Sequence, residues 1–502
     1  MNTVKPMYGW ETINWKKVEY HVFKLQKRIY RASERGDVKA VRRLQRLLTN
    51  AMDAKILAVR ELIQDNGTEK RAGVDGVNRL RNQEKLDLAN CLKLGKKTQT
   101  RRQVSIPEPG KEEKPAFGIL MMMEKAKQGL VKLALEPEWE AKFDRNSYGF
   151  RPGRSAQDAI AAIFNGIKED HKYVLDAHIE KCCEGIYHQK LLAKLNTYPR
   201  LRRPIKAWLK SGVMDGKELF PTETDTPQGG LMPLLANIAL DGLESLLEDT
   251  FKGGVANCQN GKATVVRYAD DLVVLDEELA VILTAQETIE AWLGEMGLKL
   301  KDSNTRITHT FTEHNGNLGW DFLGYNIRQY PTSKKRSLAT GNTEQKIGCQ
   351  TIIKPSKEAI KRHLQKIDEI IGSHKNSSQE QLINALNPII RGWSSYYSTV
   401  SSKETFGKID SILFNKLRGW AFFRRNRNQN NTDVISSYWG VNQGIGWKFI
   451  TPDHKYCLEK HSQTLLKQHV KVKGEKSPFD GDYVYWSERL LNYPGATNAI
   501  EV

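Results

Sequence analysis

Cysteine and long apolar runs are both scarce in this 502-residue chain. None of its six cysteines forms a Cys-x-x-Cys pair, so the sequence indicates neither a zinc cluster nor a disulfide framework, and a reducing compartment suits it best. The densest apolar run, Gly118 to Met123, has the length of a core segment and not of a membrane span. The first residues, Met1 to Lys5, lack the apolar core of a signal peptide. We therefore expect neither a membrane nor a secretory route for this protein.

Acidic residues are outnumbered, with 59 Asp and Glu against 77 Lys and Arg, which gives a net charge of +18. An excess of this size predicts binding to phosphate groups with a strong dependence on salt. The alternative is a solvated basic surface with no partner. The length allows two to four domains, each with its own core.

The segment Tyr268-Ala269-Asp270-Asp271 lies between two apolar runs, residues 264–267 and 272–275. This pattern predicts a strand, a tight turn and a second strand, with two adjacent carboxylates at the tip of a hairpin. Paired carboxylates on a rigid turn suit two divalent cations, and such sites catalyse phosphoryl transfer. Two aspartates are also ordinary turn residues. The apolar flanks favour the polymerase hairpin of a reverse transcriptase.

Residues 1–65 have the apolar spacing of helices with Lys and Arg on the opposite face, and residues 66–77 break that pattern. Strands and helices then alternate up to about residue 330, which is typical of an α/β domain. In this region we predict strands at 173–177 and 305–308. The helices are predicted at 182–195, from Gln228 to Leu246, and at 279–296.

Residues 331–355 form a polar, basic connection, and the chain beyond it is predicted to be all-helical. Ser377 with Glu380 and Ser401 with Glu404 each fit a capping box at a helix start. Basic residues alternate with aromatic ones on these helices, a composition that suits RNA. The alternative is a helical domain whose cations lie along its surface. The RNA-binding candidates are Arg391, Trp393, Tyr396, Tyr397, Arg418, Arg424 and Arg425.

Taken together, several motifs resemble the proteins encoded by group II introns, of the cyanobacterial and plastid kind, over nearly the whole chain. The motifs are Gly73–Val77, Asn146–Ser155, Thr226–Gly230, Pro233–Asn237, Arg267–Asp271, Phe322–Gly324 and Arg391–Trp393. The resemblance implies an α/β right-hand polymerase with fingers and palm, followed by an all-α thumb and maturase domain. It divides the chain into a helical extension (1–65), fingers and palm (66–330), a linker (331–355), the thumb/maturase domain X (356–470) and a linker remnant (471–502).

The resemblance also implies a catalytic aspartate on the strand before the hairpin, and this chain has His178 at that position. Imidazole is a poor ligand for Mg²⁺, which prefers oxygen donors. We therefore expect Asp270 and Asp271 to be vestigial, with weak or lost metal binding, and Mg²⁺ to matter only if polymerase activity remains. Asp176 faces the same side of the strand but lies about 7 Å away at the usual rise per residue.

Other polymerase motifs depart from the family pattern in the same direction. The resemblance gives Gln228, Gly229, Lys114 and Lys125 a role in holding the nucleotide, but the two lysines stand where the family has arginine, which is not an equivalent swap. The segment after Gly230 is one residue short, and the late Lys-Thr-Arg motif reads Asn304-Thr305-Arg306. These changes indicate that selection to maintain DNA synthesis has relaxed.

We therefore expect an intron maturase that binds structured intron RNA and assists its splicing, with reverse transcription lost. The alternative is an active RNA-directed DNA polymerase, and a third hypothesis is a remnant with no RNA partner. Residues 471–502 contain no His-Asn-His constellation, so DNA cleavage and a DNA partner are not expected. A chloroplast or a bacterial cytoplasm is the expected location, and the sequence leaves a homodimer open.

Overall fold

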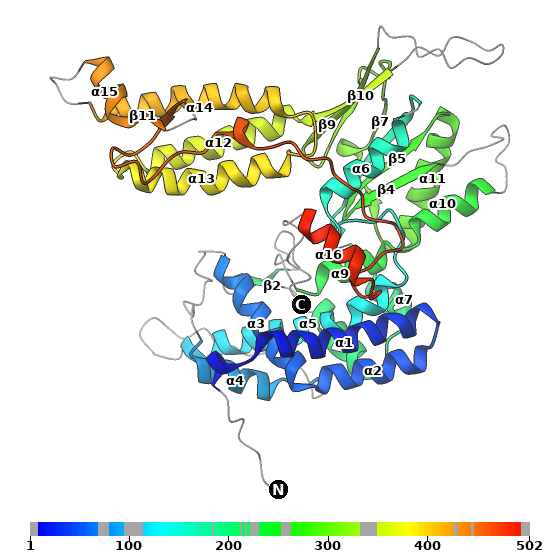
Figure 1. The fold of residues 1–502 in the computed structure, drawn as a ribbon. Helices are drawn as coiled ribbons and strands as arrows, with labels where there is room; N and C mark the ends of the chain where they lie inside the picture. Colours follow the sequence, from blue (N-terminus) through cyan, green and yellow to red (C-terminus); the bar gives the residue numbers. More distant parts are fainter. Residues whose placement is uncertain are drawn as a thin grey trace.

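The computed structural model describes residues 9–68, 80–94, 114–168, 170–182, 185–210, 213–215, 218–220, 230–252, 263–331, 349–425, 430–442 and 446–492. Figure 1 shows a lower layer of helices, a sheet region above it on the right, and a lobe of long helices at the upper left. Among the described residues no helix is both long and apolar enough to cross a membrane.

The lower layer is built from amphipathic helices that pack around the long helix α5. Its elements are η1 (Trp10–Thr12), α1 (Trp15–Glu34), α2 (Val38–Asn50), α3 (Met52–Thr68), α4 (Asn82–Cys91) and α5 (Lys114–Glu140). Val41, Leu44 and Leu48 of α2 are buried, as their three- and four-residue spacing predicts. The helical prediction for the first 65 residues is confirmed for the part of this segment that the structure describes.

The central sheet is antiparallel and has β1 (Tyr173–Glu180) in its middle. On one side β1 pairs with β5 (Asp271–Asp276), which pairs in turn with β4 (Thr264–Tyr268). On the other side it pairs with β7 (Arg306–His309) and β6 (Lys299–Leu300). The sheet therefore brings the Asp270–Asp271 turn beside the end of β1.

Helices cover both faces of this sheet, because its strands alternate their buried side chains between two apolar clusters. Leu272 and Val274 of β5 belong to the cluster that includes α5 and α11, whereas Val273 belongs to the cluster that includes α6. The other elements between residues 156 and 304 are α6 (Ala156–Ile167), α7 (His188–Leu195), α8 (Pro199–Lys210), α9 (Met232–Ala239), α10 (Leu243–Lys252), α11 (Leu279–Glu295) and η2 (Asp302–Asn304), together with β2 (Val213–Asp215) and β3 (Glu218–Phe220), which form a separate hairpin.

Two predicted helices of this region are wrong in extent. The helix predicted from Cys182 begins only at His188, because the chain leaves β1 through a loop in which Lys181 has a φ of 46°. The helix predicted from Gln228 to Leu246 is two helices, α9 and α10, which separate at Gly242, where φ is 92°. A left-handed residue cannot continue a right-handed helix.

The upper lobe begins at a second sheet of β8 (Trp320–Phe322), β9 (Tyr325–Pro331) and β10 (Cys349–Pro355). Its helices are α12 (Lys357–Ser373), α13 (Gln379–Tyr396), α14 (Lys403–Phe423) and α15 (Asn431–Tyr438). A hairpin of β11 (Trp439–Asn442) and β12 (Gly446–Phe449) and the short η3 (His461–Gln463) complete the lobe.

The prediction of an all-α region after residue 355 is therefore wrong. Trp439 and Phe449 face each other across the β11–β12 hairpin, with ring centroids 5.0 Å apart, and Phe449 packs on Trp420 of α14. Aromatic pairing against a helix stabilises this short hairpin. Part of the predicted 331–355 linker is also regular structure, since β10 pairs with β9 along seven positions.

Both predicted helix caps of the lobe are displaced by one residue. Ser378, and not Ser377, caps α13, and Gln381 closes its capping box. Ser402, and not Ser401, precedes α14, and its hydroxyl donates to the carbonyl of Tyr397 at 2.9 Å instead of capping the helix.

A C-terminal strap, which we define as residues 465–492 including α16 (Tyr483–Asn492), runs from the upper lobe back to the lower helices. Its first part meets the lobe where the Lys467 N–H donates to the Ser398 carbonyl. Its last part reaches α1, where Phe479 packs on Phe23 and Lys27 bonds the Tyr483 hydroxyl at 2.6 Å. The strap therefore contacts all three regions of the molecule.

Asp158 of α6 is the buried anchor of this strap. Its carboxylate accepts two hydrogen bonds of 2.7 Å from Arg489 and one of 2.8 Å from the Val472 N–H, and it lies 2.9 Å from His469 Nε2. Burial raises the pKa of Asp158, but the hydrogen bond with His469 and the charge of Arg489 outweigh it and lower that pKa to about 2.

We predict that Asp158→Asn destabilises the protein by about 3–5 kcal/mol, because it removes one charge of a buried ion pair. Urea unfolding of the full chain measures the effect. Asp249→Asn, in an exposed pair with Lys252, is the matched control and should leave the unfolding midpoint nearly unchanged. Because the pKa is lowered in the folded state, this stabilisation is present above about pH 4 and is lost as the pH falls toward 2. Equal unfolding midpoints for the two variants would contradict the assignment.

Candidate functional site

The predicted strand–turn–strand around Asp270 and Asp271 is confirmed. Tyr268 of β4 pairs with Asp271 of β5, and Ala269 and Asp270 form the turn between them. Ala269 has a φ of 57°, which is uncommon for a residue with a side chain. The backbone of Gly149 lies against this turn so closely that a Cβ at Gly149 would collide with the Ala269 nitrogen. The turn is therefore held by its surroundings in a conformation that it would not adopt alone.

Arg267 provides most of that support. Its guanidinium is buried and donates to Ser147 Oγ at 2.7 Å, to Asn237 Oδ1 at 2.9 Å and to the Ala269 carbonyl at 3.0 Å. The Asn237 amide donates in turn to the Gly149 carbonyl at 2.8 Å. Burial lowers the pKa of Arg267 to about 10, although Asp144 opposes the shift, so the group stays charged at neutral pH.

His178 lies directly opposite Asp271 in the pairing of β1 with β5. Its Nδ1 is 2.8 Å from Asp271 Oδ1, and its Nε2 is 3.8 Å from Asp270 Oδ2. One potential ligand atom from each of the three residues lies within 4.8 Å of the others, and all three are half-buried. The structure thus brings together the three residues that the sequence singled out for catalysis and metal binding.

Asp176 does not join this group. It is engaged by Arg306 of β7, whose Nε donates to Asp176 Oδ2 at 2.9 Å. Burial raises the pKa of Asp176 to about 6 in spite of that pair. Burial also raises the pKa of Asp271, with Asp270 adding to the shift and the hydrogen bond with His178 opposing it.

This donor set does not fit a site for two magnesium ions. Mg²⁺ demands oxygen ligands in near-octahedral geometry. A site for two such ions would need a third carboxylate beside Asp271 to balance their charge. The structure has instead a nitrogen of the His178 ring within hydrogen-bonding distance of Asp271. Two carboxylates and an imidazole suit one ion of borderline softness, such as Zn²⁺, better than a pair of hard ones.

The nucleotide-binding candidates are mostly outside the described residues. This holds for Gln228, for Gly229 and for the side chain of Lys114 at the first position of α5. Lys125 is half-buried on the same helix. Their role in holding a nucleotide remains a prediction.

The aromatic candidates for RNA binding pack against an apolar cluster of the protein, with Tyr397 buried and Trp393 and Tyr396 partly buried. Trp393 stacks on His363 with centroids 4.5 Å apart. The hydroxyls of Tyr396 and Tyr397 donate to the carbonyls of Leu323 and Gly324 at 3.0 and 3.1 Å, and Tyr397 is only 4% exposed. These tyrosines join α13 to the turn between β8 and β9, so the ring of Tyr397 is not accessible to an RNA base.

The arginine candidates divide into two kinds. Arg391 forms an ion pair with Glu459, and Arg424 lies over the Trp420 ring at 4.6 Å while it donates to the Lys375 carbonyl. Arg418 and Arg425 are exposed on and just after α14. Arg418 lies over the Phe422 ring at 5.8 Å and Arg425 donates to Asn431 Oδ1 at 3.3 Å, so these contacts are with neutral groups. Arg418 and Arg425 are the candidates whose positions best suit contact with phosphate groups.

Sequence reasoning missed a buried chain of polar groups in the upper lobe. His461 is fully buried, with Nδ1 2.8 Å from Asp410 Oδ1 and Nε2 2.8 Å from His363 Nε2. Burial lowers the pKa of His363 to about 3, with His461 adding to the shift. The three residues are far apart in the chain, and no local pattern relates them.

The chain matches three protein families in order. Residues 10–92 match the N-terminal domain of reverse transcriptase, residues 106–327 match reverse transcriptase (RNA-dependent DNA polymerase), and residues 360–439 match the group II intron, maturase-specific domain.

Curated relatives agree with these matches. Maturase-like protein 1 of Euglena gracilis is 26% identical over 392 residues, which is 76% of each chain. The group II intron-encoded protein LtrA of Lactococcus lactis subsp. cremoris is 30% identical over 153 residues, 29% of this chain and 25% of LtrA. An uncharacterized 91 kDa protein in the cob intron of Schizosaccharomyces pombe is 25% identical over 343 residues, which is 56% of this chain, and this match spans 41% of that protein. The chain therefore carries a reverse transcriptase region followed by a group II intron maturase-specific region, and in this order it is similar to group II intron-encoded and maturase-like proteins.

Proposed function

We propose that this protein is an intron maturase that binds structured group II intron RNA and assists its splicing, while the RNA itself supplies the catalysis. The observation that carries the proposal is the folded maturase-specific region, α12 to α15, which Tyr396 and Tyr397 attach to the reverse transcriptase region. The match to a maturase-like protein over 76% of each chain supports it.

In this proposal the central sheet is the palm, the lower helices contribute the fingers, and the long helices of the upper lobe form the thumb (Figure 1). The domain limits remain those expected from the sequence, 1–65, 66–330, 331–355, 356–470 and 471–502. The palm then serves as a platform for RNA, since RNA binding by basic residues requires no catalytic metal.

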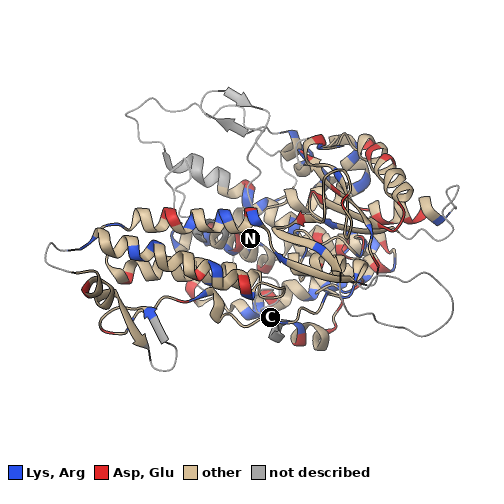
Figure 2. Cartoon of the chain, turned by 90° about the horizontal axis from the view of Figure 1, so that it is seen from above, with Lys and Arg blue, Asp and Glu red and all other residues tan. Residues whose placement is uncertain are grey.

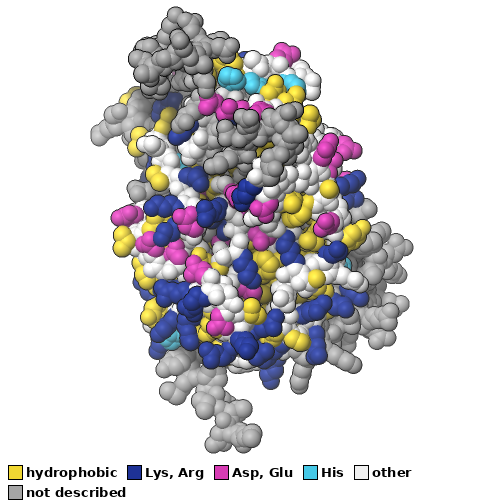
Figure 3. Space-filling model, turned by 90° about the vertical axis from the view of Figure 1, so that its right-hand side faces the viewer, with side chains coloured by type: hydrophobic (Ala, Val, Ile, Leu, Met, Phe, Trp, Pro, Cys, Tyr) yellow, Lys and Arg dark blue, Asp and Glu magenta, His cyan; other side chains and the backbone are white. Residues whose placement is uncertain are grey.

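The distribution of charge supports an RNA partner. Figure 2 shows Lys and Arg along all of the long helices, with Asp and Glu between them. Figure 3 shows a denser group of Lys and Arg on the lower part of the right-hand face, at the level of α1 and α2 in Figure 1. Helix α2 carries Lys39, Arg42, Arg43 and Arg46 in its sequence.

The second part of the proposal is that DNA synthesis is lost or nearly so. His178 Nδ1 lies within hydrogen-bonding distance of one carboxylate oxygen of Asp271, and the imidazole ring has no oxygen to offer a metal ion. The competing hypothesis, an active RNA-directed DNA polymerase, is favoured by the intact turn that presents Asp270 and Asp271.

We predict that the purified chain increases excision of the intron that carries its reading frame at low magnesium, where that RNA folds poorly alone. A splicing assay with labelled precursor RNA measures the yield.

Replacing Arg418 and Arg425 by Gln should weaken RNA binding several-fold and reduce its salt dependence, because two phosphate contacts are removed. Lys252→Gln is the control, since Glu248 and Asp249 already balance that charge on α10. Unchanged excision at both low and moderate magnesium would refute the maturase function.

We predict that His178→Asp raises the affinity for Mg²⁺ about tenfold or more, because it restores an oxygen ligand beside Asp270 and Asp271. Isothermal titration with Mg²⁺ and with Zn²⁺ measures the change, and the wild type should favour Zn²⁺. His454→Asp, at an exposed position with a φ of 58° that aspartate tolerates, is the control. Primer extension on an RNA template by the wild type, abolished by Asp270→Ala, would establish the competing polymerase hypothesis.

A further inference from the structure

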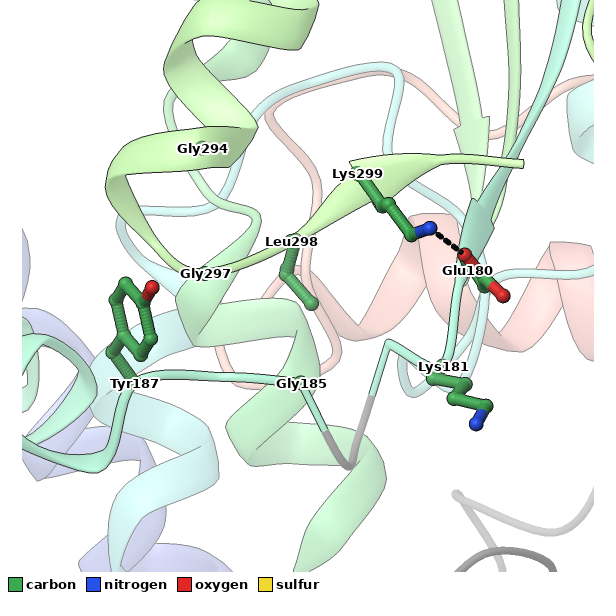
Figure 4. Close-up of a pocket in the computed structure, with 8 residues that line it drawn as sticks. All are labelled: Glu180, Lys181, Gly185, Tyr187, Gly294, Gly297, Leu298 and Lys299. Atoms are coloured by element: carbon green, nitrogen blue, oxygen red, sulfur yellow. Dashed lines mark ion pairs between the residues drawn. The ribbon is translucent and has the colours of Figure 1, made fainter. Parts of the chain in front are cut away.

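A cavity of about 420 Å³ lies just beyond the end of β1, two residues past His178. Its walls come from the loop after β1, the last turn of α11 and the start of β6. In Figure 4 Tyr187 lies on one side, Lys181 and the Glu180–Lys299 pair lie on the other, and Leu298 lies between them. The volume is within the range of pockets that hold a small organic ligand.

Tyr187 offers a flat aromatic wall. Its side chain is 59% exposed, which is high for a large ring, and its N–H is fixed by a 2.8 Å bond to the Met296 carbonyl. The ring packs against Gly297, where a Cβ would approach it to 2.8 Å and where φ is 83°. Only glycine permits this contact, so the backbone supports one side of the ring and leaves another side open to a ligand.

Gly294 lies on the same side of the cavity as Tyr187 and Gly297 (Figure 4). It lies inside the last turn of α11, where glycine costs about 1 kcal/mol relative to alanine. A Cβ at this position would meet no atom within 4 Å, so packing does not require a glycine there. A larger side chain at Gly294 would enter the cavity that this residue lines.

The rim of the cavity carries an excess of positive charge. Lys299 pairs with Glu180 at 2.8 Å, and this hydrogen bond, together with the charges of Lys299, Lys181 and Lys301, lowers the pKa of Glu180. Lys181 has a φ of 46°, an uncommon conformation for a lysine, and its carbonyl accepts a 2.9 Å bond from the Gly185 N–H. The rim therefore carries lysine side chains, and the backbone of one of them, Lys181, is held by its bond with Gly185 in an uncommon conformation.

We propose that this cavity binds one unpaired nucleotide, with the base stacked on Tyr187 and its phosphate near Lys181 and Lys299. A flat ring beside cations suits a base and its phosphate, and base–aromatic stacking is tolerant of sequence. The inference rests on the proposed function in one respect, namely that RNA bound by this protein supplies the nucleotide. A free nucleotide has the same base and phosphate groups, and the competition experiment with AMP distinguishes it from a nucleotide within RNA.

The experiment uses the full chain and a fluorescein-labelled oligoadenylate of about 12 nucleotides, with binding followed by anisotropy. Gly294→Leu, which fills the cavity, and Tyr187→Ala, which removes the ring, should each raise Kd at least about fivefold, the lower end of the loss of one stack. Tyr187→Phe should bind like the wild type. Gly372→Leu is the matched control, because this helical glycine of α12 also has no atom within 4 Å of a built Cβ.

Two further measurements identify the two parts of the ligand. Lys181→Gly keeps the left-handed backbone accessible, and it should lower the slope of log K against log salt by about 0.7, the value for one phosphate of a single strand. A blunt RNA duplex, which has no unpaired nucleotide, should bind wild type, Gly294→Leu and Tyr187→Ala equally. Displacement of the oligonucleotide by AMP from the wild type but not from Gly294→Leu would assign the site to a free nucleotide. Failure of AMP to displace it would assign the site to a nucleotide within RNA.

The outcomes separate this inference from the proposed function. If Gly294→Leu and Tyr187→Ala bind the oligonucleotide like the wild type while splicing is still assisted, the cavity proposal is overturned and the maturase function stands. If the variants lose oligonucleotide binding but the wild type does not assist splicing, the maturase function fails and the cavity remains a nucleotide site.

Discussion

The site depends on one buried cation. Arg267 donates to a serine hydroxyl, an asparagine oxygen and a main-chain carbonyl of the turn, and these groups come from three separate segments of the chain. A guanidinium has five donors in a fixed plane, so it can hold three acceptors in a single geometry. Its burial is costly, and the surrounding acceptors offset that cost only while the segments stay together. The turn therefore keeps its shape whether or not any metal binds to Asp270 and Asp271.

Predictions from the sequence succeeded where a local pattern determines the structure. The apolar flanks of the aspartate turn gave the hairpin, and the helical spacing of Val41, Leu44 and Leu48 gave a buried helix face. They failed at boundaries that tertiary contacts decide. The all-α prediction missed β11–β12, whose strands are stabilised by rings on α14, and the helix predicted from Cys182 was shortened by the loop that lines the cavity.

The candidate site was predictable only in part. His178 was found by position, but its contact with Asp271 depends on strand register, which the sequence did not specify. The RNA-binding role of Tyr396 stays a prediction, whereas the 4% exposure of Tyr397 leaves its ring no room for a base. Alternation of basic and aromatic residues is equally compatible with rings that pack on the β8–β9 turn. The cavity beside Tyr187 left no motif, since its walls come from segments about a hundred residues apart.

The strap gives the protein a particular order of assembly. Asp158 and Arg489 are 331 positions apart, so a ribosome that adds about 5–20 residues per second makes the arginine roughly 15 to 65 s after the aspartate. During that interval α6 exposes a carboxylate whose partners do not yet exist. Contacts over such separations are slow to form, because loop closure must precede them. The upper lobe and the lower helices therefore reach their final arrangement late, after the chain has been made up to Arg489.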